Sequence, residues 1–275
     1  KKVSTGSMNP TNNGAHKNNN NLVLINSDVF AQNYEDEFQE MWNGTFKKGN
    51  QVQNPSVRVG KTIISTYFCP EDNCAYHVKE ELKKATESIH FMVFSFTHDG
   101  IGNIVLLKHL DNITIQGVME ARQVTKYSEF QRLEYQGVDV VKDGNKNNLH
   151  HKVFIIDKET VITGSFNPSE GGDTRNDENM LIIHDREIAS LFLEEFEKVL
   201  PRLKMIYQRI LVNGEEIEAA EEDAERVDKD RMKCNSPRRT SGGSKKFVVK
   251  ACKDGKEKVV RFGDPNMKIK KSNPK

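Results

Sequence analysis

A histidine and a lysine separated by one residue form the part of the sequence best suited to chemistry. His150 and Lys152 are followed by Asp157, in the pattern H-x-K-x-x-x-x-D. Alternate side chains of a strand share a face, so His150 and Lys152 are expected to point to one side and His151 away from it. A neutral imidazole can attack phosphorus, while an ammonium group binds the phosphate oxygens as their charge builds up. The pattern therefore predicts attack on a phosphodiester.

Polar residues downstream are suited to complete such a site. Ser165 and Asn167 lie on a short loop after the next expected strand, where a hydroxyl and an amide can hydrogen-bond to phosphate. Glu178 could accept the second ring N–H of His150 and keep its attacking nitrogen free. Asp157 ends the strand, where it either orients a partner side chain or only makes the turn. Each residue alone is more often an ordinary surface or turn residue, but their occurrence together in this order favours a catalytic site.

The elements expected around these residues alternate between strands and helices. Short apolar runs predict strands at 61–68, 89–96, 113–119, 138–141, 149–156, 160–165 and 180–184. Helical spacing or amphipathic character predicts helices at 74–88, 101–110, 126–135 and 186–200. This alternation predicts an α/β fold.

An internal repeat organises the first 42 residues. Residues 6–10 (GSMNP) match 164–168 (GSFNP), and residues 21–25 (NLVLI) match 179–183 (NMLII), at one constant offset of 158 residues. The positions equivalent to the His-Lys-Asp motif fall at −8, −6 and −1, ahead of residue 1. We therefore expect either that the sequence is a fragment or that the protein works with one complete copy.

The stretches HHKVFIID, TGSFNPS and RNDENMLII together resemble the phospholipase D superfamily. The compact one-motif members, the Nuc-like endonucleases and small phospholipase D-like proteins, are the most similar in size. The resemblance implies a mixed β-sheet flanked by helices, here one complete module plus the trailing part of a preceding module. It also implies a site at the seam of two pseudo-twofold-related modules, a phosphohistidine intermediate, and no metal or other cofactor.

The resemblance also implies roles for six residues of this chain. They are His150 as the nucleophile or its acid/base partner, Lys152 and Asn167 as phosphate ligands, Ser165 assisting them, Glu178 supporting the histidine, and Asp157 as a more distant support. The family's chemistry uses two histidines, whereas one His-Lys pair occurs here. A second phospholipase D-like module in cis or a homodimer partner is therefore expected, and Asn20 stands where Glu178 stands in the complete copy.

Composition divides the chain into five segments. They are the trailing part of a first module (1–45), a linker (46–60), a complete module (61–205), a charged linker (206–245) and a small basic tail with the pattern of a β-hairpin (246–275). Residues 228–275 hold 16 Lys and Arg against 5 Asp and Glu. Such a tail either attracts nucleic acid or anionic membrane, or only keeps the protein soluble.

The compact module and the basic tail favour a nuclease that cleaves DNA or RNA. The alternatives are a phospholipase D or phosphatidyl transferase acting on lipids, and an inactive module that binds nucleic acid. No apolar run is long enough to span a bilayer, and the polar first residues contain no secretory segment, which predicts a cytoplasmic protein. Cys69 and Cys74 suit a metal loop or a local disulfide, but a loop leading into a helix is the preferred interpretation.

Overall fold

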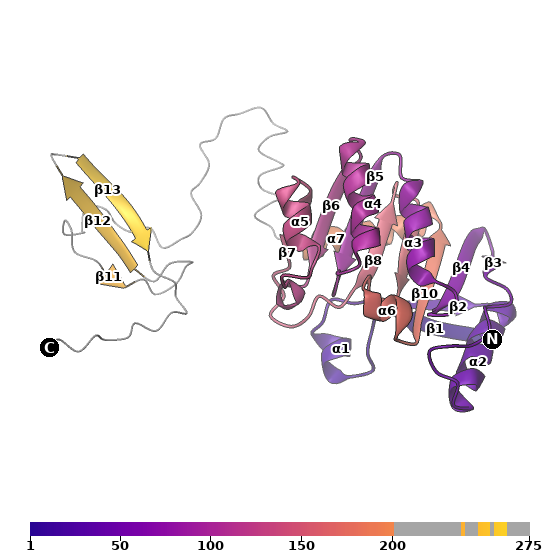
Figure 1. Cartoon of the computed structure of the whole chain (residues 1–275). Coiled ribbons are helices and arrows are strands. Elements are labelled where there is room, and N and C mark those ends of the chain that lie inside the picture. The colour runs from indigo at the N-terminus through magenta and orange to yellow at the C-terminus, as the bar shows by residue number, and fades with distance from the viewer. Residues whose placement is uncertain (201–237, 240–246, 254–255, 263–275) are drawn as a thin grey trace. The chain divides into compact units, whose positions relative to one another are not determined.

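A computed structural model describes residues 1–200, 238–239, 247–253 and 256–262. The chain divides into two compact units, Lys1–Arg209 and Ile210–Lys275, which are described separately (Figure 1). In the second unit, β11 (Arg238–Arg239), β12 (Phe247–Lys253) and β13 (Lys256–Phe262) form an antiparallel sheet in that order. Most of the linker expected at 206–245 lies outside the described residues.

The first unit contains ten strands and seven α-helices among its described residues. The strands are β1 (Lys2–Gly6), β2 (Leu22–Asn26), β3 (Ser56–Val59), β4 (Thr62–Cys69), β5 (Ser88–Val93), β6 (Thr114–Met119), β7 (Asp139–Lys142), β8 (Lys152–Ile156), β9 (Thr160–Gly164) and β10 (Glu178–His184). The helices are α1 (Asn12–His16), α2 (Asp28–Trp42), α3 (Cys74–Lys83), α4 (Asp99–Leu110), α5 (Phe130–Tyr135), α6 (Glu170–Thr174) and α7 (Arg186–Val199).

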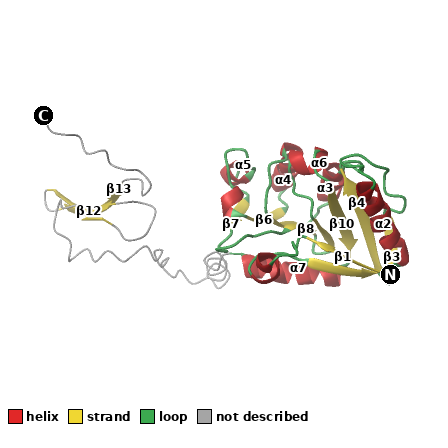
Figure 2. Cartoon of the chain, turned by 90° about the horizontal axis from the view of Figure 1, so that it is seen from below, coloured by secondary structure: helices red, strands yellow, loops and turns green. Residues whose placement is uncertain are grey.

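The main sheet has eight strands in the order β3-β4-β10-β9-β8-β5-β6-β7. The strand pairs β5–β6 and β6–β7 are parallel and the others antiparallel, so the sheet is mixed. Helices α3 to α6 lie on one face, and α7 lies with β1 on the other (Figure 2). Because both faces are covered, the central strands β5, β8 and β9 are buried along their whole length, which is why they appear as continuous apolar runs. The expected mixed sheet flanked by helices is confirmed.

The repeat in the sequence is also a repeat in the structure. Strand β1, helix α1, strand β2 and helix α2 correspond to β9, α6, β10 and α7 at the same offset of 158 residues. The strand pairs share their register, because Gly6 opposes Leu22 as Gly164 opposes Met180. The first 42 residues thus fold as a second copy of the trailing half of the complete module.

Reciprocal hydrogen bonds join the two copies. The Thr5 hydroxyl donates to Asn179 Oδ1 over 2.7 Å, and the equivalent Thr163 hydroxyl donates to Asn21 Oδ1 over 3.1 Å. Asn21 also places its amide nitrogen 3.1 Å from Nδ1 of His151. Equivalent residues making equivalent bonds in both directions are the mark of a pseudo-twofold relation between the copies.

Helix α3 ends at Lys83, five residues earlier than the sequence pattern predicts. The backbone N–H groups of Thr86, Glu87 and Ser88 donate to the carboxylate of Asp157, at 2.8–2.9 Å, instead of continuing the helix. A contact 70 residues away in sequence therefore decides where the helix stops. Helix α5 likewise begins at Phe130 rather than at residue 126, because Ser128 closes a turn onto the carbonyl of Thr125.

Two further features differ from or refine the expectations. The segment 46–60, expected to be a linker, includes β3, the edge strand beside β4. Cys69 and Cys74 are joined in a disulfide, with their Cα atoms 5.8 Å apart, at the connection between β4 and α3. Both cysteines are buried, so the bond ties the end of a core strand to the start of a core helix.

The contacts of Asn21 predict that it contributes strongly to stability. Asn21→Ala should lower the free energy of unfolding by about 2 kcal/mol, because buried polar atoms of His151 and Thr163 lose a partner. Urea denaturation at pH 7 measures the change. Asn12→Ala is the matched control, since Asn12 is exposed, and should change stability by less than about 0.5 kcal/mol. Equal losses of unfolding free energy in the two variants would contradict a stabilising role for the hydrogen bonds of Asn21 between the two copies.

Candidate active site

A pocket of about 460 Å³ opens at the seam between the two copies. Its lining comes from β1, β2 and α2, from the loops that lead into α1 and α6, and from the ends of β8 and β10: Ser4, Thr5, Gly6, Ser7, Met8, Asn9, Leu22, Tyr34, His150, Lys152, Ser165, Asn167, Glu178 and Asn179. Five of the six predicted site residues are brought together here, and Asp157 is not among them. The lining is mostly hydroxyl, amide and charged groups, which suits an anionic ligand.

The first copy, residues 1–42, binds the ring of His150. Nδ1 lies 2.8 Å from the backbone carbonyl oxygen of Ser7, and a carbonyl only accepts, so Nδ1 carries the proton and Nε2 is left with a free lone pair. The backbone N–H of His150 donates to the carbonyl of Asn19 over 2.7 Å. Burial, and then the charge of Lys152, lower the pKa of His150 below its usual value. The ring is therefore neutral near pH 7, as a nucleophile requires.

Lys152 lies on the same face of the strand, with its side chain buried. Its ammonium group donates to the carbonyl of His150 over 2.9 Å and lies 4.9 Å from the centre of the Phe94 ring. Burial lowers the pKa of Lys152 to about 7, while the charge of Glu178 opposes this shift. An incoming phosphate would favour the charged form, because an opposite charge nearby raises the pKa of an amine.

Glu178 has different partners from those the sequence suggested. Its carboxylate accepts hydrogen bonds from the hydroxyl of Ser165 and from the amide of Asn176, whereas the ring of His150 is held by the Ser7 carbonyl. The expectation that Glu178 accepts the ring N–H of His150 is therefore corrected, because the seam brings a backbone carbonyl to that nitrogen. Burial raises the pKa of Glu178, and the hydrogen bond from Ser165 opposes this.

The loop of Ser165 and Asn167 is shaped by a glycine. Gly164 has a φ of +147°, and a Cβ there would lie 2.3 Å from the carbonyl oxygen of Asn179, so glycine is required. This close approach lets the N–H groups of Ser165 and Phe166 donate to that carbonyl. Asn167 has a buried Oδ1 without a hydrogen-bond partner among the described residues. Asn167 also lines the pocket, where its side-chain NH2 group is the part that could donate to a phosphate.

Asp157 lies at the opposite end of β8 from His150 and Lys152. Its carboxylate accepts from three backbone N–H groups and from the hydroxyl of Thr86. Burial alone would raise the pKa of Asp157, but the N–H donors together lower it. Of the two roles open from the sequence, the contacts support the structural one, since the side chain fastens the turn after β8 to the start of β5.

The neighbouring histidine has a structural environment. His151 is fully buried on the other face of the strand, between the amide of Asn21 at 3.1 Å and the carboxylate of Glu195 on α7 at 3.4 Å. Its position away from the pocket agrees with the alternation expected for a strand. Its contact with Asn21 could not be predicted from local patterns, because the seam joins residues 130 positions apart.

Sequence reasoning also missed Ser7, Asn19 and Phe94, all of which touch His150 or Lys152. The rings of Phe94 and His150 lie with their centres 4.8 Å apart. Ser7 could have been found from the repeat, since it matches Ser165 at the offset of 158. Asn19 belongs to a polar run of four asparagines, and its own contacts are with Asn145, Asn148 and His150 across the seam.

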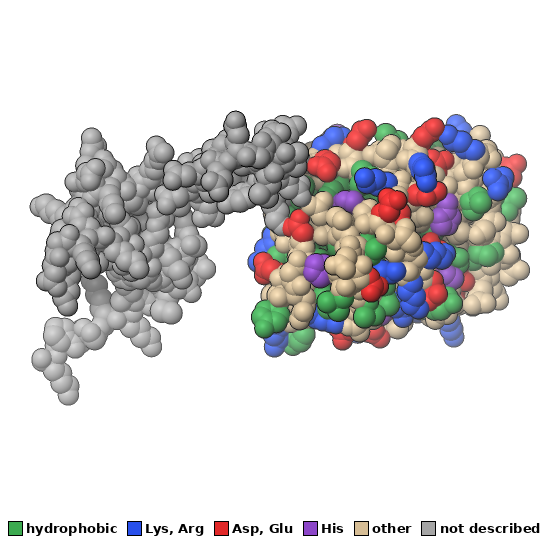
Figure 3. All heavy atoms as spheres, turned by 90° about the horizontal axis from the view of Figure 1, so that it is seen from above, with side chains coloured by type: hydrophobic (Ala, Val, Ile, Leu, Met, Phe, Trp, Pro, Cys, Tyr) green, Lys and Arg blue, Asp and Glu red, His purple; other side chains and the backbone are tan. Residues whose placement is uncertain are grey.

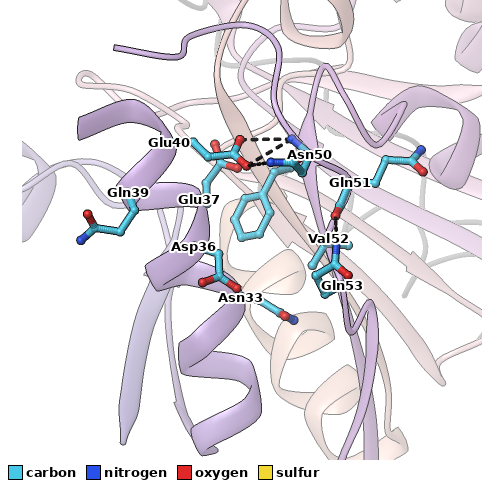
Figure 4. Close-up of a pocket in the computed structure, with 10 residues that line it drawn as sticks. Asn33, Asp36, Glu37, Gln39, Glu40, Asn50, Gln51, Val52 and Gln53 are labelled. Carbon is cyan, nitrogen blue, oxygen red and sulfur yellow. Dashed lines mark hydrogen bonds between the residues drawn. The ribbon is translucent and has the colours of Figure 1, made fainter. Parts of the chain in front are cut away.

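A second pocket, of about 320 Å³, lies between α2 and residues 50–53 (Figure 4). Glu37 and Glu40 line it, and Glu40 binds the backbone and side chain of Asn50 across it. Glu37, Glu40 and Glu71 are the only ligand-type side chains, among those the structure describes, close enough together to hold a metal ion. None of the three belongs to the seam pocket. With no histidine or cation in its lining, this pocket does not suit phosphodiester chemistry.

Comparisons with known proteins find one matching family model and several similar proteins. A family model described as "Cardiolipin synthase, PLD-like domain" matches residues 78–200, which include all six predicted site residues. The chain is similar to a phospholipase D of Rickettsia conorii, 30% identical over 148 residues, which are 53% of this chain and 74% of the relative. It is also similar to the mitochondrial cardiolipin hydrolase of Mus musculus, 33% identical over 149 residues, 54% of this chain and 67% of the relative.

Among solved structures, the chain is similar to Nuc from Salmonella typhimurium, described as a phospholipase D family member. The two are 26% identical, with a TM-score of 0.48, over 50% of this chain and 94% of Nuc.

The acidic pocket predicts a pH-dependent stability. Burial, then the charges of Glu71 and Glu40, raise the pKa of Glu37 to about 7. The folded chain therefore holds a proton that the unfolded chain has released, and stability falls as pH rises from about 4.5 to 7. Glu37→Gln should add on the order of 1 kcal/mol at pH 8, after allowance for solvent screening, and almost nothing at pH 4. Urea denaturation at both pH values measures this.

Glu134→Gln, at an exposed position on α5, is the control and should show no such difference between the two pH values. A loss of stability in Glu37→Gln at pH 8 would contradict the repulsion between these carboxylates.

Proposed function

The chain belongs to the phospholipase D superfamily of phosphodiesterases, and we propose that it is a nuclease acting through a phosphohistidine intermediate without a metal ion. The observation that carries the proposal is the seam pocket, where His150 and Lys152 lie together with the Gly-Ser-x-Asn loops of both copies. Such a pocket offers a nucleophile, a cation and neutral hydrogen-bonding groups to one phosphate. These are the groups that substitution at phosphorus needs.

In the first step the neutral ring of His150 attacks phosphorus through Nε2. A phosphorus–nitrogen bond forms while the bond to the leaving oxygen breaks, and the leaving oxygen takes a proton from an acid. Lys152 and Asn167 bind the non-bridging oxygens, and Ser165 assists from the same loop. In the second step, water attacks the phosphohistidine and loses a proton to a base, which restores His150. The acid of the first step and the base of the second can be one group.

Nucleic acid is the substrate that we favour. The resemblance to compact endonucleases and the basic composition of residues 228–275 support it, since clustered Lys and Arg attract the phosphate backbone. The pocket lining, mainly Ser, Thr and Asn, offers little apolar surface for acyl chains. On the face that Figure 3 presents, acidic and basic side chains of the N-terminal unit are interspersed, so the attraction is expected to come from residues 228–275.

A phospholipase is the second candidate, and one observation favours it. Leu22 lines the pocket and is 55% exposed, and Leu24, two residues along β2, is 65% exposed. The relatives from Rickettsia conorii and Mus musculus are named phospholipase D and cardiolipin hydrolase. No helix among the described residues is long and apolar enough to cross a membrane. A cytoplasmic location stays a prediction, and the Cys69–Cys74 disulfide is a bond more typical of oxidising compartments.

The second histidine is expected to come from a further module. In the first copy Leu22 and Trp42 are 55% and 75% exposed, whereas their counterparts Met180 and Leu200 in the complete module are 1% and 4% exposed. Strand β1 pairs only with β2 among the described strands, while its counterpart β9 pairs with β8 as well as β10. The free edge and the exposed apolar residues both support a partner module, in cis or from a second chain, at this side.

The His150→Ala variant tests the proposed nucleophile. The unaltered chain should cleave single-stranded DNA, RNA and bis(4-nitrophenyl) phosphate even in excess EDTA. In His150→Ala the rate of cleavage should fall at least about 1,000-fold, because the covalent step is lost, while the thermal unfolding temperature stays unchanged. Phosphatidylcholine and cardiolipin vesicles in the same assay separate the lipid candidate from the nuclease. Cleavage that is abolished by EDTA and restored by Mg²⁺ would overturn the mechanism.

His151→Gln is the matched control, because the amide keeps polar atoms near Asn21 and Glu195. This substitution should lower the free energy of unfolding, while the catalytic rate of the folded protein should fall far less than in His150→Ala. Equal losses of activity in the two variants, with both folded, would contradict the assignment of His150 to the pocket face.

The need for a second acid and base predicts that assembly controls activity. The 275-residue chain should turn over slowly as a monomer, because one histidine cannot be both the attacking group and the acid that protonates the leaving oxygen. Measuring molecular mass by sedimentation at the protein concentrations used for turnover decides this. If two chains supply the two histidines, turnover per chain should rise with concentration as dimers form. A fully active monomer would show that one histidine suffices.

A further inference from the structure

Glu120, at the end of β6, has a fully buried carboxylate directed at the start of the catalytic strand. Its Oε2 accepts the backbone N–H of Leu149, which is also fully buried, over 2.7 Å. Leu149 is the residue immediately before His150. The backbone N–H of Glu120 donates to the carbonyl of Val93, which lies opposite Lys152 in the sheet. The backbone of Glu120 is therefore bound to Val93, the sheet neighbour of Lys152, and its side chain binds Leu149, the chain neighbour of His150.

Arg122 extends this contact to the loop before His150. Its backbone N–H and its Nε bind the other carboxylate oxygen of Glu120, at 3.0 and 3.3 Å. Its guanidinium also donates to the side chain of Asn148 over 3.0 Å and to the carbonyl of Lys146 over 2.8 Å, and contacts the carbonyl of Asn147. One carboxylate and one guanidinium thus hold four consecutive residues that lead into His150.

The same loop contacts the first copy at Asn19, which is also hydrogen-bonded to the backbone of His150. The carbonyl of Asn148 accepts from the N–H of Asn19, and the carbonyl of Asn19 accepts from the N–H of His150. A shift of Leu149 would therefore move both the backbone bond to Asn19 and the ring bond to Ser7. The attacking nitrogen can be placed correctly only if the strand begins where Glu120 holds it.

We propose that Glu120 is a positioning residue for His150, acting through the N–H of Leu149 and supported by Arg122. The inference rests on the proposed function, because it assigns a role in presenting the nucleophile. A buried carboxylate needs hydrogen-bond partners. For Glu120 these are the backbone N–H groups of Leu149 and Arg122 and the guanidinium of Arg122, which also orders the loop before His150. Residues that orient a functional group from one layer away typically change its activity 10- to 100-fold when removed.

The structure offers a matched control for Glu120. Glu129 is another buried carboxylate, 3% exposed against 0% for Glu120, and it also pairs with an arginine two or three residues later, Arg132, at 3.0 Å. Glu129 has no contact with the catalytic strand in the described hydrogen bonds. Glu120→Gln and Glu129→Gln therefore remove similar buried charges, and only the first changes the support of His150.

The test compares the ring of His150 in the two variants by ¹⁵N NMR of histidine-labelled protein, with the signals assigned from His150→Ala. In the unaltered chain and in Glu129→Gln, Nδ1 should carry the proton and the ring should titrate below the usual histidine pKa. In Glu120→Gln the titration should move upward toward that value, because a loosened strand exposes the ring to water. With bis(4-nitrophenyl) phosphate, kcat should fall about 10-fold or more while KM changes less than about threefold.

The NMR arm needs no turnover, so the inference and the proposed function can fail separately. A chain without phosphodiesterase activity would overturn the function, whereas the His150 titration still decides the role of Glu120. If Glu120→Gln does not fold, Arg122→Gln replaces it, since Arg122 is 55% exposed and its loss should shift the titration in the same direction. Identical His150 titrations in the altered and unaltered chains, or equal shifts in Glu129→Gln, would overturn the inference.

Discussion

The hydrogen bond from the ring of His150 to the carbonyl of Ser7 is the contact on which the site depends. It selects the tautomer with a free Nε2, and it comes from a segment 143 residues earlier in the chain. Within the part of the chain that the structure describes, no hydrogen bond from the complete module's own strands does this for the ring. The reciprocal bonds of Thr5 with Asn179 and of Thr163 with Asn21 keep that segment in place. The geometry of the His150 ring is therefore a property of the seam between two copies.

Burial gives the same pocket its electrostatic character. It lowers the pKa of His150 and of Lys152, the latter to about 7, and raises the pKa of Glu178. Burial disfavours the charged form of all three groups, and an anionic phosphate nearby would favour the charged form of Lys152. The ammonium form of Lys152 would therefore be favoured most when a phosphate lies beside it.

Local patterns in the sequence were enough for the strands of the main sheet other than β3, and for the face of β8 that carries His150 and Lys152. They were also enough for the loop of Ser165 and Asn167, because alternation and turn residues are short-range properties. They failed where a distant partner decides the outcome. Asp157 ends α3 early by binding N–H groups 69 to 71 residues away, and Ser7 takes the position at His150 that Glu178 seemed to fill. Ser7 was reachable only through the repeat, which identifies equivalent residues without showing that they meet.

The two copies contribute unequally to the pocket despite their similar backbones. The complete copy supplies the imidazole, ammonium and carboxylate groups of the lining, from His150, Lys152 and Glu178, whereas the first copy supplies hydroxyl, amide and carbonyl groups. Asn20 stands in the place of Glu178, and its amide donates to the carbonyl of Gly14 at 2.7 Å rather than adding a carboxylate. A phosphate in this pocket would meet positive charge from one side only. In the proposed mechanism the first copy therefore orients the nucleophile, and the complete copy holds the anion that it attacks.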